Sequence, residues 1–121
     1  MFINLSNHAS SEWSEKQKKA ALEYGEIVDL PFPNVNPEVD ELEIEQLAKQ
    51  YYQKIMDTAG GAMCVVHPMG EMTLAFALIS LLQKNNIVCL ASTSKRHSIK
   101  MDNNTKKIIF DFVKFRKYKI F

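Results

Sequence analysis

The fold is decided by residues 62–91, which read AMCVVHPMGEMTLAFALISLLQKNNIVCLA. Residues 62–67 are apolar without alternation, which is typical of a central parallel strand covered on both faces, and Pro68 ends that strand. Residues 71–84 are apolar almost all round, which predicts either the most buried helix of the protein or a helix in a subunit interface. Residues 87–91 are again apolar, so the stretch predicts a strand, a helix and a second buried strand of a parallel sheet.

The chain before this stretch repeats the same alternation of elements. Residues 2–6 and 26–32 are short apolar runs closed by polar or proline-containing loops, and each predicts a strand. An amphipathic helix is expected over residues 13–24, because Gly25 stands where a helix should end. A second one begins near Asp40 and ends at Gly60 and Gly61. The sequence therefore predicts an α/β fold, a three-layer Rossmann-like domain with about four parallel strands and flanking helices.

A basic hairpin is predicted at the C-terminal end of the chain. Residues 98–102 and 106–118 are expected to form two strands around Asn103 and Asn104, with Ile108 and its alternate neighbours on one face. One domain is expected over residues 1–121, with an α/β core over 1–96 and the hairpin over 97–121.

Charge is distributed unevenly along the chain. Residues 1–94 carry six Lys and Arg against twelve Asp and Glu, a net charge of −6, whereas residues 95–121 carry nine against two, a net charge of +7. Lysine is common on exposed sheet edges, where it prevents strand addition. A cluster of cations also attracts polyanions. The sequence leaves both explanations of the basic segment open.

Composition excludes several classes of protein. With 46% hydrophobic and 24% charged residues, the chain is neither disordered nor collagen-like. Its longest apolar stretch is far shorter than the roughly 20 residues that span a bilayer, and no signal peptide is apparent, so we expect a cytoplasmic protein without a membrane partner. Cys64 and Cys89 lie in apolar runs, which argues against a disulfide framework and a zinc site.

Polar clusters follow three of the predicted strands. In a parallel sheet the loops after the carboxyl ends of the strands meet at one edge, where ligands bind. The candidate catalytic residues there are His8, His67 and Glu71. The candidate ligand-binding residues are Ser6, Asn7, Met69, Gly70, Thr73, Ser92, Thr93, Ser94, Lys95 and Arg96. This mixture of hydroxyls, an amide, imidazoles and cations suits a nucleotide-like ligand.

Each candidate also has a structural explanation. Histidines that close strands are often structural, and Glu71 is expected to cap its helix because acids are favoured in the first turn. Gly70 either lets a ligand approach or forms a tight turn. Neither G-x-G-x-x-G nor a Walker motif is present, so a classical dinucleotide or NTP site is not expected. The histidines and Glu71 lack metal-ligand spacing, and no serine has the context of a hydrolase nucleophile. We therefore expect no metal and no cofactor.

Four short motifs carry a resemblance to a known group of proteins. They are Asn4-Leu5-Ser6-Asn7-His8, Pro31-Phe32-Pro33, the segment from His67 to Thr73, and Ala91-Ser92-Thr93-Ser94. Over most of residues 1–96 the chain resembles the small stand-alone Rossmann-type proteins of type III CRISPR loci, which are related to CARF domains. The resemblance implies antiviral signalling by a homodimer that binds a cyclic oligoadenylate across its two-fold axis, and in ring-nuclease members cleaves it. The chain departs from that group in having no Lys or Arg in the loops after the first and third strands.

Cleavage of this kind needs no metal and no enzyme nucleophile, because a ribose 2′-hydroxyl attacks the neighbouring phosphate when it is held in line. Ser6 and Asn7 would orient the ligand, Lys95 and Arg96 would offset phosphate charge, and His8 or His67 would act as acid or base. The main alternative is a nucleoside deoxyribosyltransferase-like enzyme or N-glycosidase with Glu71 as nucleophile. A non-catalytic nucleotide-binding module and an RNA-contacting basic tail are further alternatives, and no DNA partner is expected.

Overall fold

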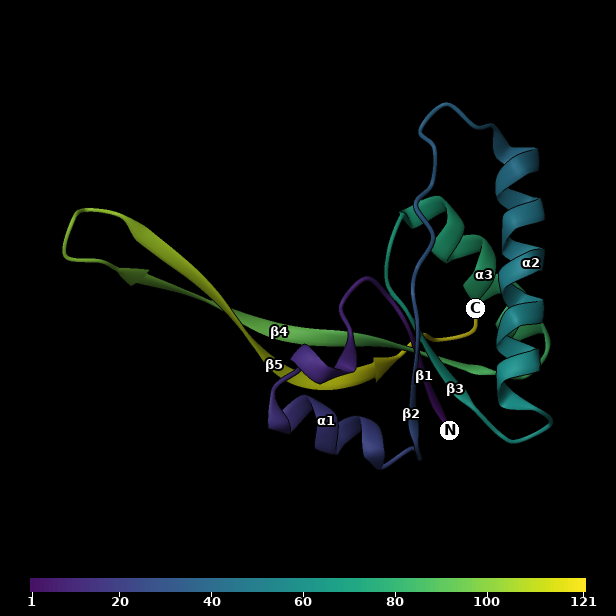
Figure 1. The fold of residues 1–121 in the computed structure, drawn as a ribbon, viewed down its shortest axis with the longest axis horizontal. Helices are drawn as coiled ribbons and strands as arrows, with labels where there is room; N and C mark the ends of the chain where they lie inside the picture. Colours follow the sequence, from purple (N-terminus) through teal and green to yellow (C-terminus); the bar gives the residue numbers. More distant parts are fainter.

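Four parallel strands form the centre of the sheet in the computed structural model, which describes residues 1–121 (Figure 1). They are β1 (Phe2–Leu5), β2 (Ile27–Leu30), β3 (Val65–Pro68) and β4 (Val88–Lys100). The fifth strand, β5 (Lys106–Lys117), pairs antiparallel with β4. The strand order is β2-β1-β3-β4-β5. The prediction of an α/β fold built around four parallel strands is confirmed.

Three α-helices cover the two faces of this mixed sheet. α1 (Glu15–Leu22) packs on one face, where Ala21 contacts Phe2 and Leu90. α2 (Glu41–Ala59) and α3 (Met72–Lys84) pack on the other face, so the fold has three layers. No helix combines the length and apolarity needed to cross a membrane.

The helix expected over residues 13–24 is observed as α1, which begins and ends two residues inside the predicted bounds. A 3-10 turn, η1 (Ser10–Glu12), precedes α1, and Ser14 between them is extended, with φ −62° and ψ 157°. The Ser14 hydroxyl accepts a hydrogen bond from the backbone N–H of Gln17, so Ser14, one of the two serines that could cap this helix, is its N-cap. Trp13 lies just before the cap, and its ring packs against Phe2 and His67.

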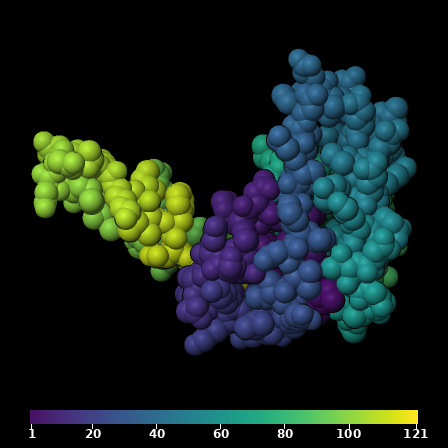
Figure 2. Space-filling model, in the orientation of Figure 1, coloured from purple at the N-terminus to yellow at the C-terminus, as the bar shows by residue number.

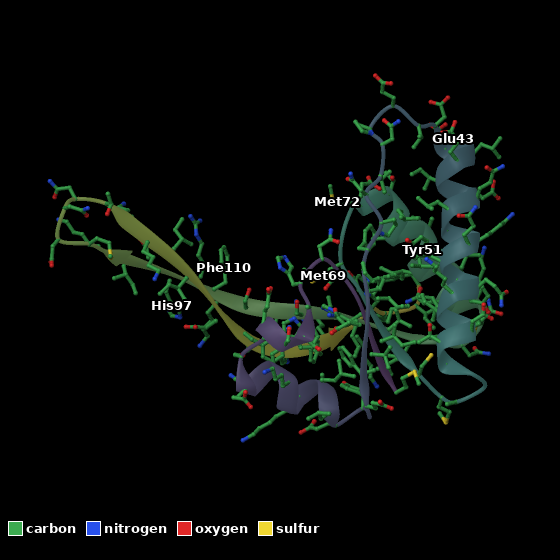
Figure 3. All side chains as sticks on the ribbon, viewed as in Figure 1. Glu43, Tyr51, Met69, Met72, His97 and Phe110 are labelled. Atoms are coloured by element: carbon green, nitrogen blue, oxygen red, sulfur yellow. The ribbon has the colours of Figure 1, made fainter.

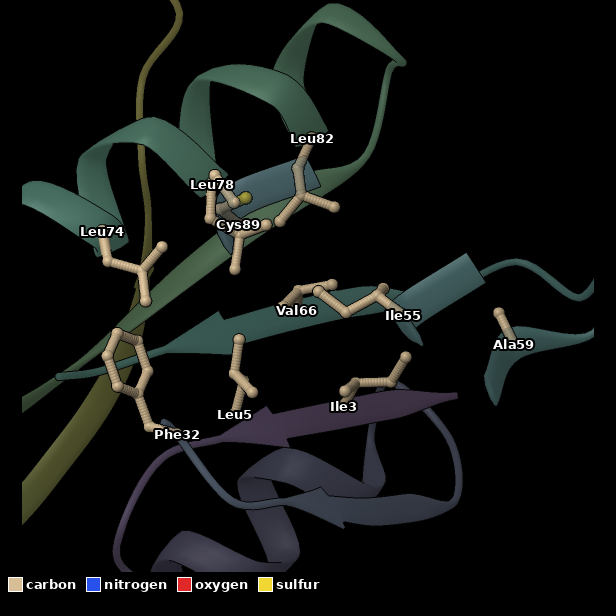
Figure 4. Close-up of a cluster of buried hydrophobic side chains, with 11 residues drawn as sticks. Ile3, Leu5, Phe32, Ile55, Ala59, Val66, Leu74, Leu78, Leu82 and Cys89 are labelled. Atoms are coloured by element: carbon tan, nitrogen blue, oxygen red, sulfur yellow. The ribbon is translucent and has the colours of Figure 1, made fainter. Parts of the chain in front are cut away.

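The main core lies between the sheet and the pair formed by α2 and α3 (Figure 4). α3 buries three of its 13 residues, Leu74, Leu78 and Leu82, whereas α2 buries three of 19. α3 is therefore the most buried helix by proportion, as predicted. Its opposite side is not covered, because Phe76 and Met72 remain 74% and 83% exposed.

Strand β4 is much longer than predicted. The polar segment Ser92–Arg96 was expected to be a loop, but it lies inside β4, and this prediction is wrong. The physical reason is continuous pairing with β5, which runs from Leu90 opposite Lys117 to Lys100 opposite Lys106 with one bulge near Thr93. No Gly or Pro interrupts this part of the chain. The predicted strand at 98–102 is thus the end of β4, and the sheet has five strands, not six.

The far half of this hairpin projects away from the rest of the molecule, as Figures 1 and 2 show. We call residues 95–111 the arm and the remainder of the chain the body. No residue of the arm is buried. The arm turns at residues 101–105, where Asn104 has a positive φ of 63°. The body therefore contains the entire buried core.

Candidate functional site

Three polar side chains lie side by side across the centre of the sheet. The strand register places Asn4 of β1 opposite Asp29 of β2 and also opposite His67 of β3. Residues paired in a sheet point to the same face, so the three side chains form one continuous line, which we call the polar row. Asn4 and His67 are only 1% and 2% exposed.

Hydrogen bonds fix the orientation of every group in the polar row. The Asn4 Nδ2 atom donates to Asp29 Oδ1 over 2.8 Å, and a carboxylate can only accept. Asn4 Oδ1 therefore faces His67 Nδ1 at 3.0 Å. Because an amide oxygen cannot donate, the proton of the His67 ring must be on Nδ1. The lone pair of the neutral imidazole is consequently on Nε2.

His67 lies in an unusually apolar environment. The rings of Phe2, Trp13 and Phe115 surround it, with ring centroids 5.9, 5.8 and 5.4 Å away. Burial lowers the pKa of His67 from its usual value near 6.5 to about 4, since the imidazolium would lose its hydration. Its Nε2 atom is buried and has no hydrogen-bond partner. Such an unsatisfied buried acceptor is rare in folded proteins and points to a missing donor.

A cavity of about 580 Å³ opens beside His67, on the face covered by α1. Its volume is within the range typical of small-molecule sites. The lining residues are His8, Glu12, Trp13, Ser14, Lys16, Gln17, His67, Met69, Ser92, Thr93, Ser94, Phe110, Asp111 and Phe112. They come from the loop after β1, from η1 and α1, from the end of β3 and the loop that follows it, and from the base of the β4–β5 hairpin.

The strand order explains why the cavity is located there. After β1 the chain forms β2 on one side of β1, then crosses back to form β3 on the other side. The loops that leave β1 and β3 therefore diverge, and the gap between such loops is where ligands bind in open α/β sheets. His8 and Met69 lie in these two loops, and both line the cavity.

Six of the predicted site residues meet at this cavity: His8, His67, Met69, Ser92, Thr93 and Ser94. The Ser92 hydroxyl contacts Met69 Sδ at 3.2 Å. The Thr93 hydroxyl donates to the carbonyl of Lys114 and accepts from its N–H, so it is occupied by the bulge of the hairpin. The serine hydroxyls are the better candidates for contact with a ligand.

Glu71 and Thr73 lie outside the cavity and form the cap of α3. The Glu71 carboxylate accepts hydrogen bonds from the backbone N–H groups of Thr73 and Leu74, at 3.0 and 2.8 Å, and from the Thr73 hydroxyl at 2.7 Å. The Thr73 hydroxyl, and then the two N–H groups, lower the pKa of Glu71. The capping role expected of Glu71 is observed.

Gly70 also has a structural explanation. A Cβ atom at this position would collide with the ring of Phe32, which is buried in the main core. The loop after β3 can pass over Phe32 only because residue 70 has no side chain. The structure thus gives Gly70 a third role, close packing against Phe32, besides the ligand approach and the tight turn that the sequence suggested.

The four remaining candidates lie around the cavity without lining it. Ser6 is buried, and its hydroxyl donates to Asn4 Oδ1 at 2.8 Å and accepts from the N–H of His8 at 3.2 Å. Ser6 therefore holds the side chain of Asn4, the central residue of the polar row, in place. Asn7 is exposed in the loop after β1, whereas Lys95 and Arg96 are exposed on the arm.

Sequence reasoning did not identify Asn4, Asp29, Trp13 or Lys16 as site residues. One signal was available, because Asn4 is a polar residue inside an apolar strand, and a buried amide requires partners. Asp29 holds η1 in place by accepting from the N–H and hydroxyl of Ser10. This connects the polar row to the segment that carries Trp13. Nothing local in the sequence indicated that Trp13 would cover His67.

The chemistry available at the cavity is that of a neutral acceptor in apolar surroundings. The charged lining residues are Lys16, Glu12 and Asp111. His67 can accept a proton or a hydrogen bond at Nε2, the serine hydroxyls can donate, and Trp13 and Phe112 offer aromatic surface. Nowhere does the structure bring together three His, Cys, Asp or Glu side chains that could hold a metal ion.

Comparison with known proteins gives a single finding. Searches of the curated proteins and of the solved structures each found no match. The model of the family described as "Uncharacterized protein MJ1673 family" matches residues 1–116, which is nearly the whole chain. The chain therefore belongs to the MJ1673 family.

Proposed function

We propose that the cavity binds a cyclic oligoadenylate and that His67 assists its cleavage without a metal ion. The observation that carries the proposal is the buried Nε2 atom of His67, which has a lone pair, a fixed tautomer and no partner. A ribose 2′-hydroxyl is a donor that would satisfy this atom. The aromatic rings beside it would stack on a base, and the serine hydroxyls of β4 would bind phosphate oxygens.

The proposed reaction is a transesterification within the ligand. The 2′-oxygen forms a bond to the adjacent phosphorus while the bond from phosphorus to the 5′-oxygen breaks. His67 Nε2 receives the proton of the 2′-hydroxyl, and His8, the second imidazole at the cavity, returns a proton to the leaving 5′-oxygen. The product is a linear adenylate with a 2′,3′-cyclic phosphate end.

The ligand itself would adjust His67 for this role. A base with a pKa near 4 is too weak to accept a proton readily at neutral pH. A bound phosphodiester is negatively charged, and a negative charge within a few ångströms raises the pKa of an imidazole. His67 would thus be neutral in the free protein and a competent base once the ligand is bound. Since Nε2 is buried from solvent, binding must also move one of the side chains that cover it.

The parallel part of the sheet supports a Rossmann-like fold. Its order β2-β1-β3-β4 matches the first four strands of one of the two common doubly wound sheets, while β5 differs in being antiparallel. Four short motifs resemble the CARF-related proteins, whose ligand is shared by two copies of the chain. We therefore propose a CARF-like homodimer with a cavity in each copy facing the shared ligand.

The experiment that tests the function uses mass spectrometry. The protein is incubated with cyclic tri-, tetra- and hexa-adenylate in the presence of EDTA, and separately with deoxynucleosides. We expect linear adenylates with 2′,3′-cyclic phosphate ends from one of the rings. Release of free base would support glycosyl transfer instead, and a ligand that binds but stays intact would reduce the function to binding.

Two variants make the assay specific to the cavity. His67→Gln keeps a donor for Asn4 but removes the imidazole, and turnover should fall by roughly 10²–10⁴, the usual contribution of a positioned acid or base. Glu71→Gln is the matched control, since it changes a carboxylate outside the cavity and should leave turnover within about a factor of two. No cleavage and no binding of any ring by the intact protein would contradict the proposal.

A further inference from the structure

The arm carries large apolar side chains that remain substantially exposed in this molecule. Phe110 is 66% exposed, and Ile99 and Ile108 are each 45% exposed. A two-stranded hairpin is at best marginally stable in water, and it needs a third strand or a surface to pack against. The body contacts only the base of the hairpin. The projecting half therefore lacks the partner that its composition requires.

One face of the arm carries Phe110 and Ile108 together with Arg96, Lys100 and Lys106, whereas Ile99, Lys95 and Lys107 lie on the other face. The register places Arg96 opposite Phe110, with Ile108 and Lys106 following on the same side of β5. Figure 3 shows Phe110 and His97 pointing to opposite sides of the arm. Over residues 95–111 five Lys and Arg stand against two Asp, a net charge of +3. A partner for this face must be apolar and acidic.

The body offers a surface of that kind between α2 and α3. A groove of about 450 Å³ lies there, with Ile44, Ala48 and Leu81 among its apolar lining residues. Its charged lining residues are three acids, Asp40, Glu41 and Glu45, and two lysines, Lys49 and Lys84. Lys49 pairs with Glu45 at 3.5 Å, so the acidic side of the rim is the end at Asp40 and Glu41. Residues 38–48 contain five acids and no Lys or Arg. The exposed Phe76 of α3 lies beside the groove, three residues after Thr73 and four before Ser80, which both line it.

We propose that the arm of one molecule lies along the α2–α3 groove of a second copy of the chain. Phe110 and Ile108 would cover the apolar floor and Phe76, while Arg96 and Lys106 would face the acidic rim. The length of the arm strand matches the length of the groove. Residues 106–112 of β5 span roughly 20 Å at 3.3 Å per residue, and the 13 residues of α3 span roughly 20 Å at 1.5 Å per residue.

Other partners account for fewer of these observations. Protection of a sheet edge explains the lysines but not Phe110 and Ile108, which would promote association. Pairing of two arms would place two segments of net charge +3 against each other, and like charges across an interface disfavour it. A polyanion would neutralise the cations and leave the α2–α3 groove and Phe76 uncovered. A second copy accounts for both the arm and the groove.

A two-fold arrangement would exchange both arms, so that each groove is filled and the assembly closes as a dimer. The exchange also concerns the cavity, because Phe110, Asp111 and Phe112 at the base of the arm form one of its walls. Docking of the arm would hold that wall in place. The inference does not depend on the ligand, since arm exchange stands whether or not the cavity binds an adenylate.

The test is a charge exchange between two variants, read by the mass of the assembly in solution at micromolar concentration. One variant is Arg96→Glu with Lys106→Glu, and the other is Glu41→Lys with Glu45→Lys. Each variant alone opposes like charges and should be a monomer, with dimer affinity reduced about tenfold or more. An equal mixture should restore a dimer that contains one chain of each, because both contacts then pair opposite charges.

Matched controls separate docking from general effects of charge and polarity. Lys19→Glu with Lys119→Glu makes the same change in net charge outside the arm and should leave the wild-type dimer intact. Ile108→Ser should weaken the dimer, whereas Ile120→Ser, also exposed but outside the arm, should not. Circular dichroism verifies that each variant folds.

Three outcomes would overturn the proposal: a monomeric wild type, a dimer in either charge variant alone, or a mixture that stays monomeric. If the wild type is monomeric and the Arg96→Glu, Lys106→Glu variant loses affinity for a labelled RNA, the arm binds polyanions instead. Adenylate cleavage is measured separately, so failure of arm exchange is distinguishable from failure of the proposed function.

Discussion

The body and the arm depart from ordinary burial in opposite directions. In the body a polar atom, His67 Nε2, is buried without a partner. In the arm apolar side chains such as Phe110 are exposed without a partner. Each departure carries a free-energy cost, since a buried acceptor loses its bond to water and an exposed ring orders water around it.

The difference identifies two kinds of missing partner. A single unsatisfied acceptor beside a cavity calls for a small molecule that brings one donor. A strip of apolar and basic side chains about 20 Å long calls for a macromolecular surface. One chain of 121 residues thus has an unsatisfied acceptor in its body and exposed apolar side chains in its projecting arm.

The largest expected contrast concerns packing in the two regions. Leu78→Ala removes a fully buried side chain from the main core and should lower the free energy of unfolding by about 3 kcal/mol. Ile99→Ala on the arm should change it by less than about 0.5 kcal/mol, because Ile99 is on the arm face opposite Phe110. Urea unfolding monitored by circular dichroism measures both. Equal losses would show that the arm is packed in the folded protein.

A second contrast concerns pH. The pKa of His67 is about 4 in the folded protein and near 6.5 when unfolded, so between these values the unfolded chain binds more protons. Stability is therefore lost as pH falls, by about 2 kcal/mol between pH 7 and pH 5. His67→Gln should abolish this part of the pH dependence, whereas His97→Gln on the arm should retain it. The same pH dependence in all three proteins would contradict a buried, neutral His67.

A third contrast compares two carboxylates. Asp29 is linked to His67 through Asn4, and Asp111 pairs directly with His97. Asp29→Ala removes the acceptor for Asn4 and for Ser10, and should destabilise the protein by about 1.5 kcal/mol. Asp111→Ala removes the exposed partner of His97, 3.0 Å away, and should cost less than about 0.5 kcal/mol. Thermal unfolding of both variants in one buffer measures the difference. A larger loss of stability for Asp111→Ala than for Asp29→Ala would contradict the structural role of the polar row.

The smallest contrast concerns local hydrogen bonds at two exposed positions. Glu71→Ala removes the cap of α3 and should lower the denaturant midpoint, and Glu71→Gln should restore most of that loss. Thr105→Ala in the arm removes the hydroxyl that donates to Asn103 Oδ1 and should change stability by less than about 0.5 kcal/mol. Denaturant midpoints resolve both effects. No loss on Glu71→Ala would contradict the capping role.

Much of the body could be predicted from local pattern. The apolar spacing along residues 41–59 and 71–84 predicted α2 and α3, and the continuous apolar runs at Val65 and Val88 predicted central parallel strands. These signals are local because each element buries its own apolar face against the same core. The edge where His8, His67 and Ser92 meet followed from the general rule for parallel sheets.

The hairpin with its turn near Asn103 and Asn104 was also predicted, but its length and the polar row could not be predicted in that way. Ser92–Arg96 has the polar composition of a loop, although it pairs with β5. The polar row depends on a register that brings Asp29, Asn4 and His67 together from three separate strands. Such an arrangement leaves no spacing signature along the chain, and only the isolated Asn4 indicated it.

The central claim is that His67 holds an unprotonated Nε2 beside a cavity that binds an adenylate. The most direct measurement is nitrogen-15 NMR of the histidine side chains, with and without a cyclic adenylate that keeps its 2′-hydroxyls but has a methylene group in place of each 5′-oxygen, so that it cannot be cleaved. We predict that His67 has its proton on Nδ1 and stays neutral down to about pH 4–5 in the free protein. On addition of the adenylate its Nε2 resonance should shift and its pKa should rise. A proton on Nε2, titration near the usual value of about 6.5, or an unchanged Nε2 resonance with every ring size would contradict the account.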